Sequence, residues 1–266
     1  MKTILFSLPG NQVLTELLAE KMKAEIGNCT IRKFPDGESY TRILSDVKDK
    51  CVVMVAPYLA YMRQDKVFHE GEGVTSGFFG KLISGFADSI TTIDPHLHRI
   101  LSLGEVYNIQ NRVIHAADEI SKYIKENIYN PVLIGPDSES EQWVSDVAKK
   151  AGVPFIVLQK IRHGDRNVEV SVPDVDKYKD ATPVLVDDII STARTMIETT
   201  GHLKSAGMKP AICIGIHAVF SGNAYQDLWD AYVEDIITCN TIPHQSNKID
   251  LSDIIAKEVK ELMRHI

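Results

Sequence analysis

The sequence predicts an α/β protein in which parallel sheets are flanked by helices. Short β-branched runs recur along the chain and alternate with segments whose apolar residues have helical spacing. Several of these runs, such as the one at 184–186, lack the polar alternation of a half-exposed strand, which is typical of strands covered on both faces. The chain has 266 residues, of which 44% are hydrophobic, so it can form one large or two modest domains.

In the first half of the chain, the apolar runs at 3–7, 51–56, 89–93 and 112–115 favour strands, because β-branched residues fit a pleated surface. Between and after them, residues 12–26, 77–87 and 116–126 place apolar side chains on one helical face. The order predicts repeated strand, helix, strand units, which usually build parallel sheets.

The second half continues in the same way. Strands are expected at 132–134, 155–158, 184–186 and 211–217, and helices at 140–151 and 195–206. Gly207 suits the end of the last of these helices, because glycine readily adopts a left-handed backbone. Residues 169–172 alternate in polarity, which indicates a partly exposed hairpin arm. The stripe of apolar residues within 251–266 predicts a closing helix.

Composition excludes several classes of protein. A net charge of −7 disfavours a nucleic-acid-coating surface. The four cysteines are far apart, which disfavours a zinc site or a disulfide framework and fits a reducing compartment. The start of the chain lacks the pattern of a signal peptide, and no apolar run is long enough to span a bilayer. We therefore expect a cytoplasmic protein without a nucleic-acid or membrane partner.

One segment, VLVDDIISTART, places two acids and several hydroxyls between a strand and a helix. Ser191, Thr192 and Thr195 and the first helical N–H groups could hold a phosphate. Asp187 and Asp188 would then face a sugar diol or a cation, because carboxylate repels phosphate. Together they describe a site for a phosphorylated pentose. The alternative is that the acids merely complement the helix dipole.

Two motifs in the first half carry aromatic and charged residues. In FPDGESY, Phe34 could stack on a base while Asp36 and Glu38 accept hydrogen bonds from an amine or a ribose, although such a sequence is more often only a hairpin or loop. In YMRQD, Arg63 could bind a phosphate or a base, or could simply be exposed in a surface loop.

Three further motifs follow predicted strands. DPHLH offers His96 and His98 as donors or ligands, although two histidines at this spacing can also make capping and surface contacts. GPDSESEQW offers the carboxylate of Asp137 at the entry to a helix. QKIRHGDR is a cationic arm that is either a solvated loop or a device that stabilises a transferring phosphoryl group. Its cations are Lys160, Arg162 and Arg166.

Taken in this order, the motifs resemble those of the ribose-phosphate diphosphokinases, the phosphoribosyl-pyrophosphate (PRPP) synthetases, and the resemblance covers nearly the whole chain. FPDGE and YMRQD are similar to the ATP-binding segments of that family, DPH to its metal and phosphate site, and Lys160-Ile161-Arg162 to its catalytic arm. VLVDDIISTART is similar to its ribose-5-phosphate loop, and FSGNA and TCNTIP to its C-terminal signatures.

The resemblance implies two phosphoribosyltransferase-like domains, at 1–112 plus 249–266 and at 113–248. It implies transfer of the diphosphoryl group of ATP to the 1-hydroxyl of ribose 5-phosphate, giving PRPP and AMP, with Mg²⁺ at His96 and Asp137. The implied ATP-binding residues are Phe34, Asp36, Glu38, Arg63, Gln64, Asp65 and His96. The implied ribose-5-phosphate-binding residues are Asp187, Asp188, Ser191, Thr192, Ala193, Arg194 and Thr195. Lys160 and Arg162 are the implied catalytic residues. A homo-oligomer is also implied, with the FPDGE loop reaching a neighbour's ATP site.

The sequence departs from the family pattern at three places. Ala193 and Arg194 stand where the family usually has paired glycines, and SESEQ stands at 138–142 where many members have a glycine-containing loop. About one βαβ repeat is missing between Val55 and Pro57, which we interpret as an apparent internal deletion. Two rival hypotheses therefore remain: a non-catalytic subunit related to PRPP synthetases, and a phosphoribosyltransferase that consumes PRPP.

Overall fold

The computed structural model describes residues 3–97, 99–136, 140–163, 167–171, 173 and 175–265. The chain divides into two compact units, a first unit of Met1–Ile114 with Leu251–Ile266 and a second unit of His115–Asp250. The domain boundaries expected from the sequence lie two residues from these divisions. Parallel sheets flanked by helices confirm the α/β class. No helix among the described residues is long and apolar enough to cross a bilayer.

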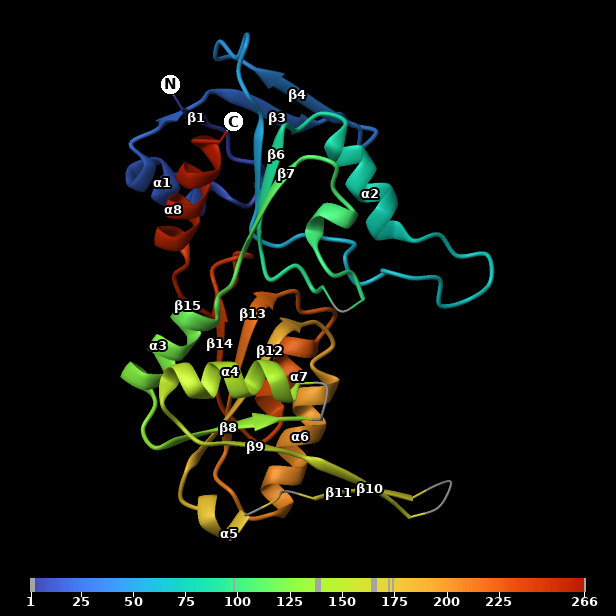
Figure 1. Ribbon diagram of the computed structural model, residues 1–266, viewed down its shortest axis with the longest axis vertical. Helices are drawn as coiled ribbons and strands as arrows, with labels where there is room; N and C mark the ends of the chain where they lie inside the picture. Colours follow the sequence, from blue (N-terminus) through green and yellow to red (C-terminus); the bar gives the residue numbers. More distant parts are fainter. Residues whose placement is uncertain are drawn as a thin grey trace. The chain divides into compact units, whose positions relative to one another are not determined.

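The described part of the first unit contains three small sheets (Figure 1). Two short strands pair in parallel, β1 (Ile4–Leu5) and β2 (Glu25–Ile26). An antiparallel hairpin joins β3 (Cys29–Lys33) and β4 (Ser39–Ile43). The third sheet is parallel, with the order β5 (Val53–Ala56), β6 (Ser89–Ile93) and β7 (Gln110–Ile114). The helices are α1 (Gln12–Met22), α2 (Thr75–Ser84), η1 (Leu103–Glu105) and α8 (Ser252–Met263).

Apolar side chains from β5, β6 and α2 form the core of this unit. Ala56, Ile90 and Ile83 are buried together with two further residues, Leu103 in η1 and Tyr107 shortly after it. Burial raises the pKa of the Tyr107 hydroxyl to about 12. The core therefore holds the ends of β5 and β6 in place, and the segments that follow those strands start from a rigid base.

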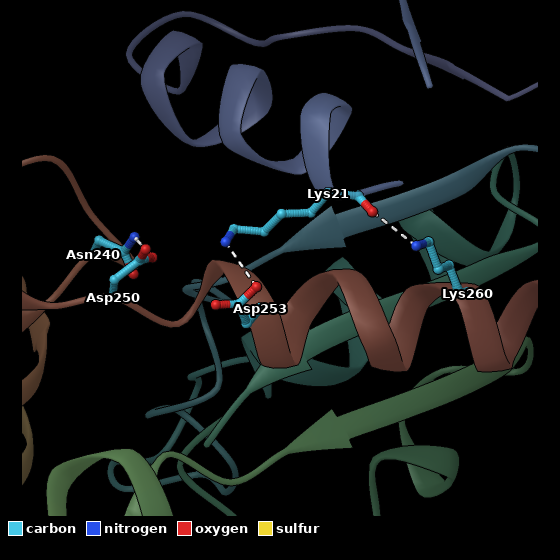
Figure 2. Close-up of polar contacts among 5 residues, drawn as sticks. All are labelled: Lys21, Asn240, Asp250, Asp253 and Lys260. Atoms are coloured by element: carbon cyan, nitrogen blue, oxygen red, sulfur yellow. Dashed lines mark hydrogen bonds and ion pairs between the residues drawn. The ribbon is translucent and has the colours of Figure 1, made fainter. Parts of the chain in front are cut away.

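The C-terminal helix α8 packs against α1, so the end of the chain completes the first unit. Lys21 Nζ lies 2.7 Å from Asp253 Oδ1, and Lys260 Nζ donates to the backbone oxygen of Lys21 at 2.8 Å (Figure 2). Arg112 on β7 also forms an ion pair with Glu258 on α8 at 3.5 Å. In the second unit, just before this helix, Asn240 Nδ2 donates to Asp250 Oδ1 at 2.7 Å.

The second unit is built on a parallel sheet with the strand order β15-β14-β13-β12-β8-β9 (Figure 1). Its strands are β8 (Pro131–Gly135), β9 (Phe155–Val157), β12 (Thr182–Ile190), β13 (Ala211–Ala218), β14 (Val233–Cys239) and β15 (Asn247–Ile249). Strands β10 (Gln159–His163) and β11 (Asn167–Ser171) form a separate antiparallel ribbon. The helices are α3 (Ala117–Asn127), α4 (Glu141–Ala151), α5 (Val175–Tyr178), α6 (Arg194–Ser205) and α7 (Ala224–Asp230).

Most of the expected elements differ from the structure by a few residues at their ends, and two of these differences are instructive. The helix expected at 12–26 ends at Met22, because Lys23 takes a left-handed backbone with φ of 54° and closes the last turn. The strand expected at 184–186 extends from Thr182 to Ile190, since both β8 and β13 pair with it. Asp187 and Asp188 therefore lie inside the last part of a strand and not in the loop after it.

Candidate functional site

The order of the strands in the second unit marks one place where ligands usually bind. From β8 the chain passes outward to β9, whereas from β12 it passes in the other direction to β13, β14 and β15. The topological switch point thus lies between β8 and β12. In open α/β sheets, ligands bind in the crevice outside the carboxyl ends of the strands at such a point.

Strand β12 continues beyond the end of its pairing with β8. The pairing with β8 ends at Leu185 and Ile134, whereas the pairing with β13 continues to Ile190 and Ala218. Asp187 and Asp188 lie in this overhang and are half-buried, and the N–H of Asp188 donates to Asp187 Oδ1 at 2.9 Å. The structure therefore places both carboxylates at the switch point.

The loop that follows β12 leads directly into α6. Its residues Ser191, Thr192 and Ala193 precede the first helical residue, Arg194, and no described side chain caps the helix. The N–H groups of the first helical turn point out of such an end, so they can receive an anion. Thr192, Arg194 and Thr195 are exposed, whereas Ser191 is half-buried. The backbone oxygen of Ser191 accepts the N–H of Ser221 at 3.1 Å, which ties the loop to the segment after β13.

Ala193 is held in an unfavourable backbone conformation. It has φ of 56° and ψ of 7°, and its side chain is only 7% exposed. A left-handed conformation costs a residue with a Cβ about 1–2 kcal/mol, whereas glycine adopts it freely. Alanine at this position of the loop therefore carries a cost in strain that glycine would not.

Gly215 on β13 determines where the loop begins. A Cβ at this position would lie 2.6 Å from both Cδ1 and Cγ1 of Ile190, the last residue of β12. Ile190 is buried in the core of the second unit, so its side chain has no free space to enter. The absence of a side chain at Gly215 thus allows Ile190 to pack and sets the position of Ser191.

A partly buried polar network joins the carboxyl end of β14 to the segment that leads into β15. Thr238, Ser246 and Asn247 are linked by hydrogen bonds of 2.8 Å, and Ser246 Oγ lies 2.7 Å from His244 Nδ1. The N–H of Ser246 also donates to His244 Nδ1 at 3.2 Å, so this nitrogen is an acceptor and carries no proton. Burial lowers the pKa of His244, in agreement with a neutral ring.

The FPDGE segment is the tip of the β3–β4 hairpin, as the alternative interpretation expected. The N–H of Phe34 donates to the backbone oxygen of Glu38 at 2.8 Å, and the N–H of Glu38 donates to Asp36 Oδ1 at 3.1 Å. Gly37 has φ of 93°, which the tight turn requires. Arg32 lies 4.7 Å from the ring of Phe34 and 4.5 Å from that of Tyr40, a cation–π contact that the motif alone did not indicate.

The YMRQD and DPH segments follow the neighbouring parallel strands β5 and β6, so the fold brings them together at one sheet edge. Arg63 is exposed. Gln64 is half-buried, and its side-chain oxygen accepts a hydrogen bond from the hydroxyl of Thr75 at the beginning of α2. Asp65 forms an ion pair with Arg99, which no sequence motif indicated.

Both segments contain residues with a strained backbone. Tyr61 has φ of 69°, Asp94 of 35° and His96 of 56°, although none of these residues is glycine. Such conformations persist only where the surroundings enforce them, and they are frequent at ligand sites. The strain therefore supports a functional role for both segments, in addition to the indication from their residue types.

Several expected site residues are described incompletely. Asp137 and His98 lie outside the described residues. In the β10–β11 ribbon, Lys160 is paired with Val170 and Arg162 with Val168, but only the backbone of these strands is described. Within the described ranges, no three His, Cys, Asp or Glu side chains gather in a cluster able to hold a metal ion by themselves.

Comparison with known proteins identifies relatives of both units. Residues 3–56 match the family described as the N-terminal domain of ribose phosphate pyrophosphokinase, and residues 102–253 match the phosphoribosyl transferase domain. Ribose-phosphate pyrophosphokinase 2 of Archaeoglobus fulgidus is 29% identical, with 94% of this chain and 98% of that protein covered. Ribose-phosphate pyrophosphokinase of Methanopyrus kandleri is 29% identical over 92% of this chain and 94% of its own.

A solved structure also has the same fold over the full length. The crystal structure of phosphoribosylpyrophosphate synthetase from Mycobacterium smegmatis covers 100% of both chains, with a TM-score of 0.84 and 21% sequence identity. At 21% sequence identity, this comparison supports a shared fold and no more than that. The alignments cover the curated relatives almost completely, so the apparent deletion before Pro57 does not prevent alignment along their length.

Proposed function

The chain belongs to the phosphoribosyltransferase-type ribose-phosphate pyrophosphokinases, and on this premise we propose that it is an enzyme that transfers the diphosphoryl group of ATP to the 1-hydroxyl of ribose 5-phosphate, giving PRPP and AMP. One observation carries the proposal: a pyrophosphokinase N-terminal domain precedes the phosphoribosyl transferase domain in the same chain. A transferase that only consumes PRPP would not need the ATP-type motifs of the first unit.

In this reaction, the 1-hydroxyl oxygen of ribose 5-phosphate attacks the β-phosphorus of ATP. A new P–O bond forms, the bond from the β-phosphorus to the oxygen shared with the α-phosphate breaks, and AMP leaves while the hydroxyl proton is released. Phosphoryl-type transfer needs mainly positioning and neutralisation of charge. Lys160 and Arg162, on the β10–β11 ribbon, are the residues that stabilise the charge that develops on the transferred group.

Ribose 5-phosphate binds at the carboxyl end of β12. Asp187 and Asp188 accept hydrogen bonds from the sugar hydroxyls, because their half-buried carboxylates lie at the switch point. The 5-phosphate binds at the loop that precedes α6 and at the first turn of that helix, where the N–H groups have no described side-chain cap. The residues of this loop are Ser191, Thr192, Ala193, Arg194 and Thr195.

ATP binds through residues of the first unit. Phe34, Asp36 and Glu38 at the hairpin tip interact with the base and ribose. Arg63 and Gln64 after β5 and His96 after β6 approach the phosphates, since these two strands end side by side. Asp65 is also expected to contribute to the ATP site, and its carboxylate is paired with Arg99.

Magnesium fits this arrangement as an ion carried largely by the nucleotide. Mg²⁺ usually takes one or two protein carboxylates together with phosphate oxygens and water, so a preformed cluster of three ligands is not required. His96 and Asp137 are the expected protein partners of this ion, whereas Asp187 and Asp188 are expected at the ribose hydroxyls or at a second Mg²⁺. When bound, the ion neutralises charge on the phosphate oxygens.

The finer assignments rest on the same resemblance. The enzyme acts in the cytoplasm as a homo-oligomer in which the hairpin tip with Phe34 reaches the ATP site of a neighbouring subunit. The exposed ring of Phe34 supports this arrangement, because a base could stack on it. The rival hypothesis, a non-catalytic subunit, is favoured only by the missing repeat before Pro57.

The proposal is tested by incubating the purified chain with ATP and Mg²⁺, with and without ribose 5-phosphate. We expect AMP and PRPP to appear in equal amounts and only when the sugar phosphate is present. ADP as the nucleotide product would indicate transfer of a single phosphoryl group. No nucleotide product from folded protein would favour the non-catalytic subunit, and consumption of added PRPP with a base would favour the transferase.

A further inference from the structure

Asp65 is a buried carboxylate that is paired with a partly exposed arginine. The side chain of Asp65 is 2% exposed and that of Arg99 is 53% exposed. Arg99 Nη1 lies 3.1 Å from Asp65 Oδ1 and 3.3 Å from Oδ2, so one guanidinium nitrogen contacts both carboxylate oxygens. The guanidinium also lies 5.9 Å from the ring centre of Phe68. Arg99 thus interacts with both Asp65 and Phe68.

Because Asp65 is buried, loss of this ion pair should have a larger effect on the structure around it than loss of a surface ion pair. An exposed pair contributes little, because water and salt screen it. A carboxylate removed from water needs an opposite charge or several donors, and removing its partner leaves an uncompensated charge. The position of Arg99 is therefore coupled to the segment that contains Asp65, directly after Arg63 and Gln64.

Arg99 also belongs to the segment that carries His96. The beginning of this segment is fixed to the sheet, because the N–H of Asp94 donates to the backbone oxygen of Ile114 at 3.0 Å. Asp94 and His96 then adopt strained left-handed conformations, and Leu97 packs against the core of the first unit. The Asp65–Arg99 pair fixes the far end of the same segment.

We propose that Arg99 is a positioning residue for the ATP half of the reaction. Paired with Asp65, it holds the segment of His96 against the segment of Arg63 and Gln64, and the two segments together keep the phosphate-binding groups at a constant spacing. The strained backbone at Asp94 and His96 could otherwise relax, since non-glycine residues in this conformation need external support. This inference rests on the proposed function, because the groups whose spacing Arg99 maintains are those expected to bind ATP.

The experiment compares Arg99→Gln and Arg99→Lys with the wild type in steady-state assays that vary ATP and ribose 5-phosphate separately. A displacement of about 1 Å in a positioning group can lower efficiency by about 100-fold. We therefore expect kcat/KM for ATP to fall by about tenfold to 100-fold in Arg99→Gln, with KM for ribose 5-phosphate unchanged. Arg99→Lys should recover part of the loss, because it keeps the charge.

Arg112→Gln is the matched control. Arg112 forms an arginine–carboxylate pair with Glu258 in the same unit, at 3.5 Å and with side chains 40% and 21% exposed, but it joins β7 to α8. We expect this variant to lose some thermal stability while kcat/KM for ATP stays within about twofold of the wild type. An equal loss of ATP efficiency in both variants would overturn the inference, since it would reflect general destabilisation.

Binding of α,β-methylene-ATP with Mg²⁺, measured by calorimetry, separates this inference from the proposed function. Weaker binding by Arg99→Gln supports the positioning role even if the chain makes no PRPP. Unchanged binding and unchanged kcat/KM for ATP would overturn it, even if PRPP is formed. If Arg99→Gln does not fold, a double variant that exchanges the two charges, Asp65→Arg with Arg99→Asp, is compared with the single variant Asp65→Arg. A double variant that folds and binds the ATP analogue more tightly than the single variant supports the role of the pair. A double variant that binds the analogue no better than the single variant contradicts it.

Discussion

Replacing Gly215 by alanine should disturb the second unit and the ribose-5-phosphate loop together. The added Cβ would lie 2.6 Å from Cδ1 and Cγ1 of Ile190, whereas carbon atoms in contact are normally about 3.5–4.0 Å apart. About 1 Å must therefore be gained by moving Ile190 or the strand that carries it. Ile190 is 1% exposed and surrounded by core side chains, so it cannot turn towards solvent.

The magnitude follows from this overpacking. Extra methyl groups in a well-packed core usually cost about 1–3 kcal/mol. In a domain of this size, each kcal/mol lowers Tm by about 4 °C, so Gly215→Ala should melt about 4–12 °C below the wild type. Because Ile190 directly precedes Ser191, the shift should also raise KM for ribose 5-phosphate more than KM for ATP.

Gly201→Ala is the matched control for the same chemical change. Gly201 is exposed in α6, and a Cβ there would meet no atom within 4 Å. Alanine is preferred to glycine inside a helix by about 0.5–1 kcal/mol, so this variant should melt slightly above the wild type. Calorimetry of both variants and steady-state kinetics check the argument. A Gly215→Ala protein that melts within 2 °C of the wild type would refute the packing reasoning.

Three further predictions concern catalysis, binding and pH. Lys160→Ala should lower kcat by about 100- to 1000-fold with a modest change in KM, because the ammonium acts on the transition state; unchanged turnover would remove the ribbon from the mechanism. Asp188→Asn should raise KM for ribose 5-phosphate by about tenfold to 100-fold, through loss of hydrogen bonds to a charged group, whereas an equal rise in KM for ATP would contradict its assignment. Since burial lowers the pKa of His244 from its ordinary value of 6.5, the unfolded chain binds the proton more readily, so Tm should fall as the pH drops below 6.5. In His244→Gln, Tm measured by calorimetry from pH 7.5 to 5 should depend less on pH than in the wild type. An unchanged dependence of Tm on pH would exclude His244 as its source.

Regular elements with a strong apolar pattern were predictable from the sequence. The strand at 89–93 has the predicted bounds, and α3, α4 and α6 differ from expectation by a residue at each end or less. Strands β14 and β15 were not predicted, since their apolar runs are short or interrupted by polar residues such as those of Asn247–Ile249. The short β2 falls inside the helix expected at 12–26, because its two residues continue the helical spacing of α1.

The candidate site was predictable where the motif itself carries the chemistry. Asp187 and Asp188 were chosen by residue type, and the sheet order then places them at the switch point. Arg99 had no such signal, because its partner Asp65 lies far away in the sequence and only the pairing of β5 with β6 brings the two together. The strain at Ala193 was likewise visible only as a departure from glycine, and its backbone angles required the structure.

The most direct test of the central claim is to follow one oxygen atom. Ribose 5-phosphate labelled with ¹⁸O at the 1-hydroxyl is incubated with the purified chain, ATP and Mg²⁺, and the products are analysed by mass spectrometry and ³¹P NMR. The anomeric oxygen also exchanges with water through the open-chain aldehyde, so the label in PRPP is compared with that of ribose 5-phosphate recovered from the same reaction. If the sugar hydroxyl attacks the β-phosphorus of ATP, PRPP carries the same fraction of label as this sugar phosphate and AMP contains none. PRPP with clearly less label than the recovered sugar phosphate would mean that the bond from C1 to its oxygen breaks, and ADP with ribose 1,5-bisphosphate would mean attack at the γ-phosphorus; either result would contradict diphosphoryl transfer.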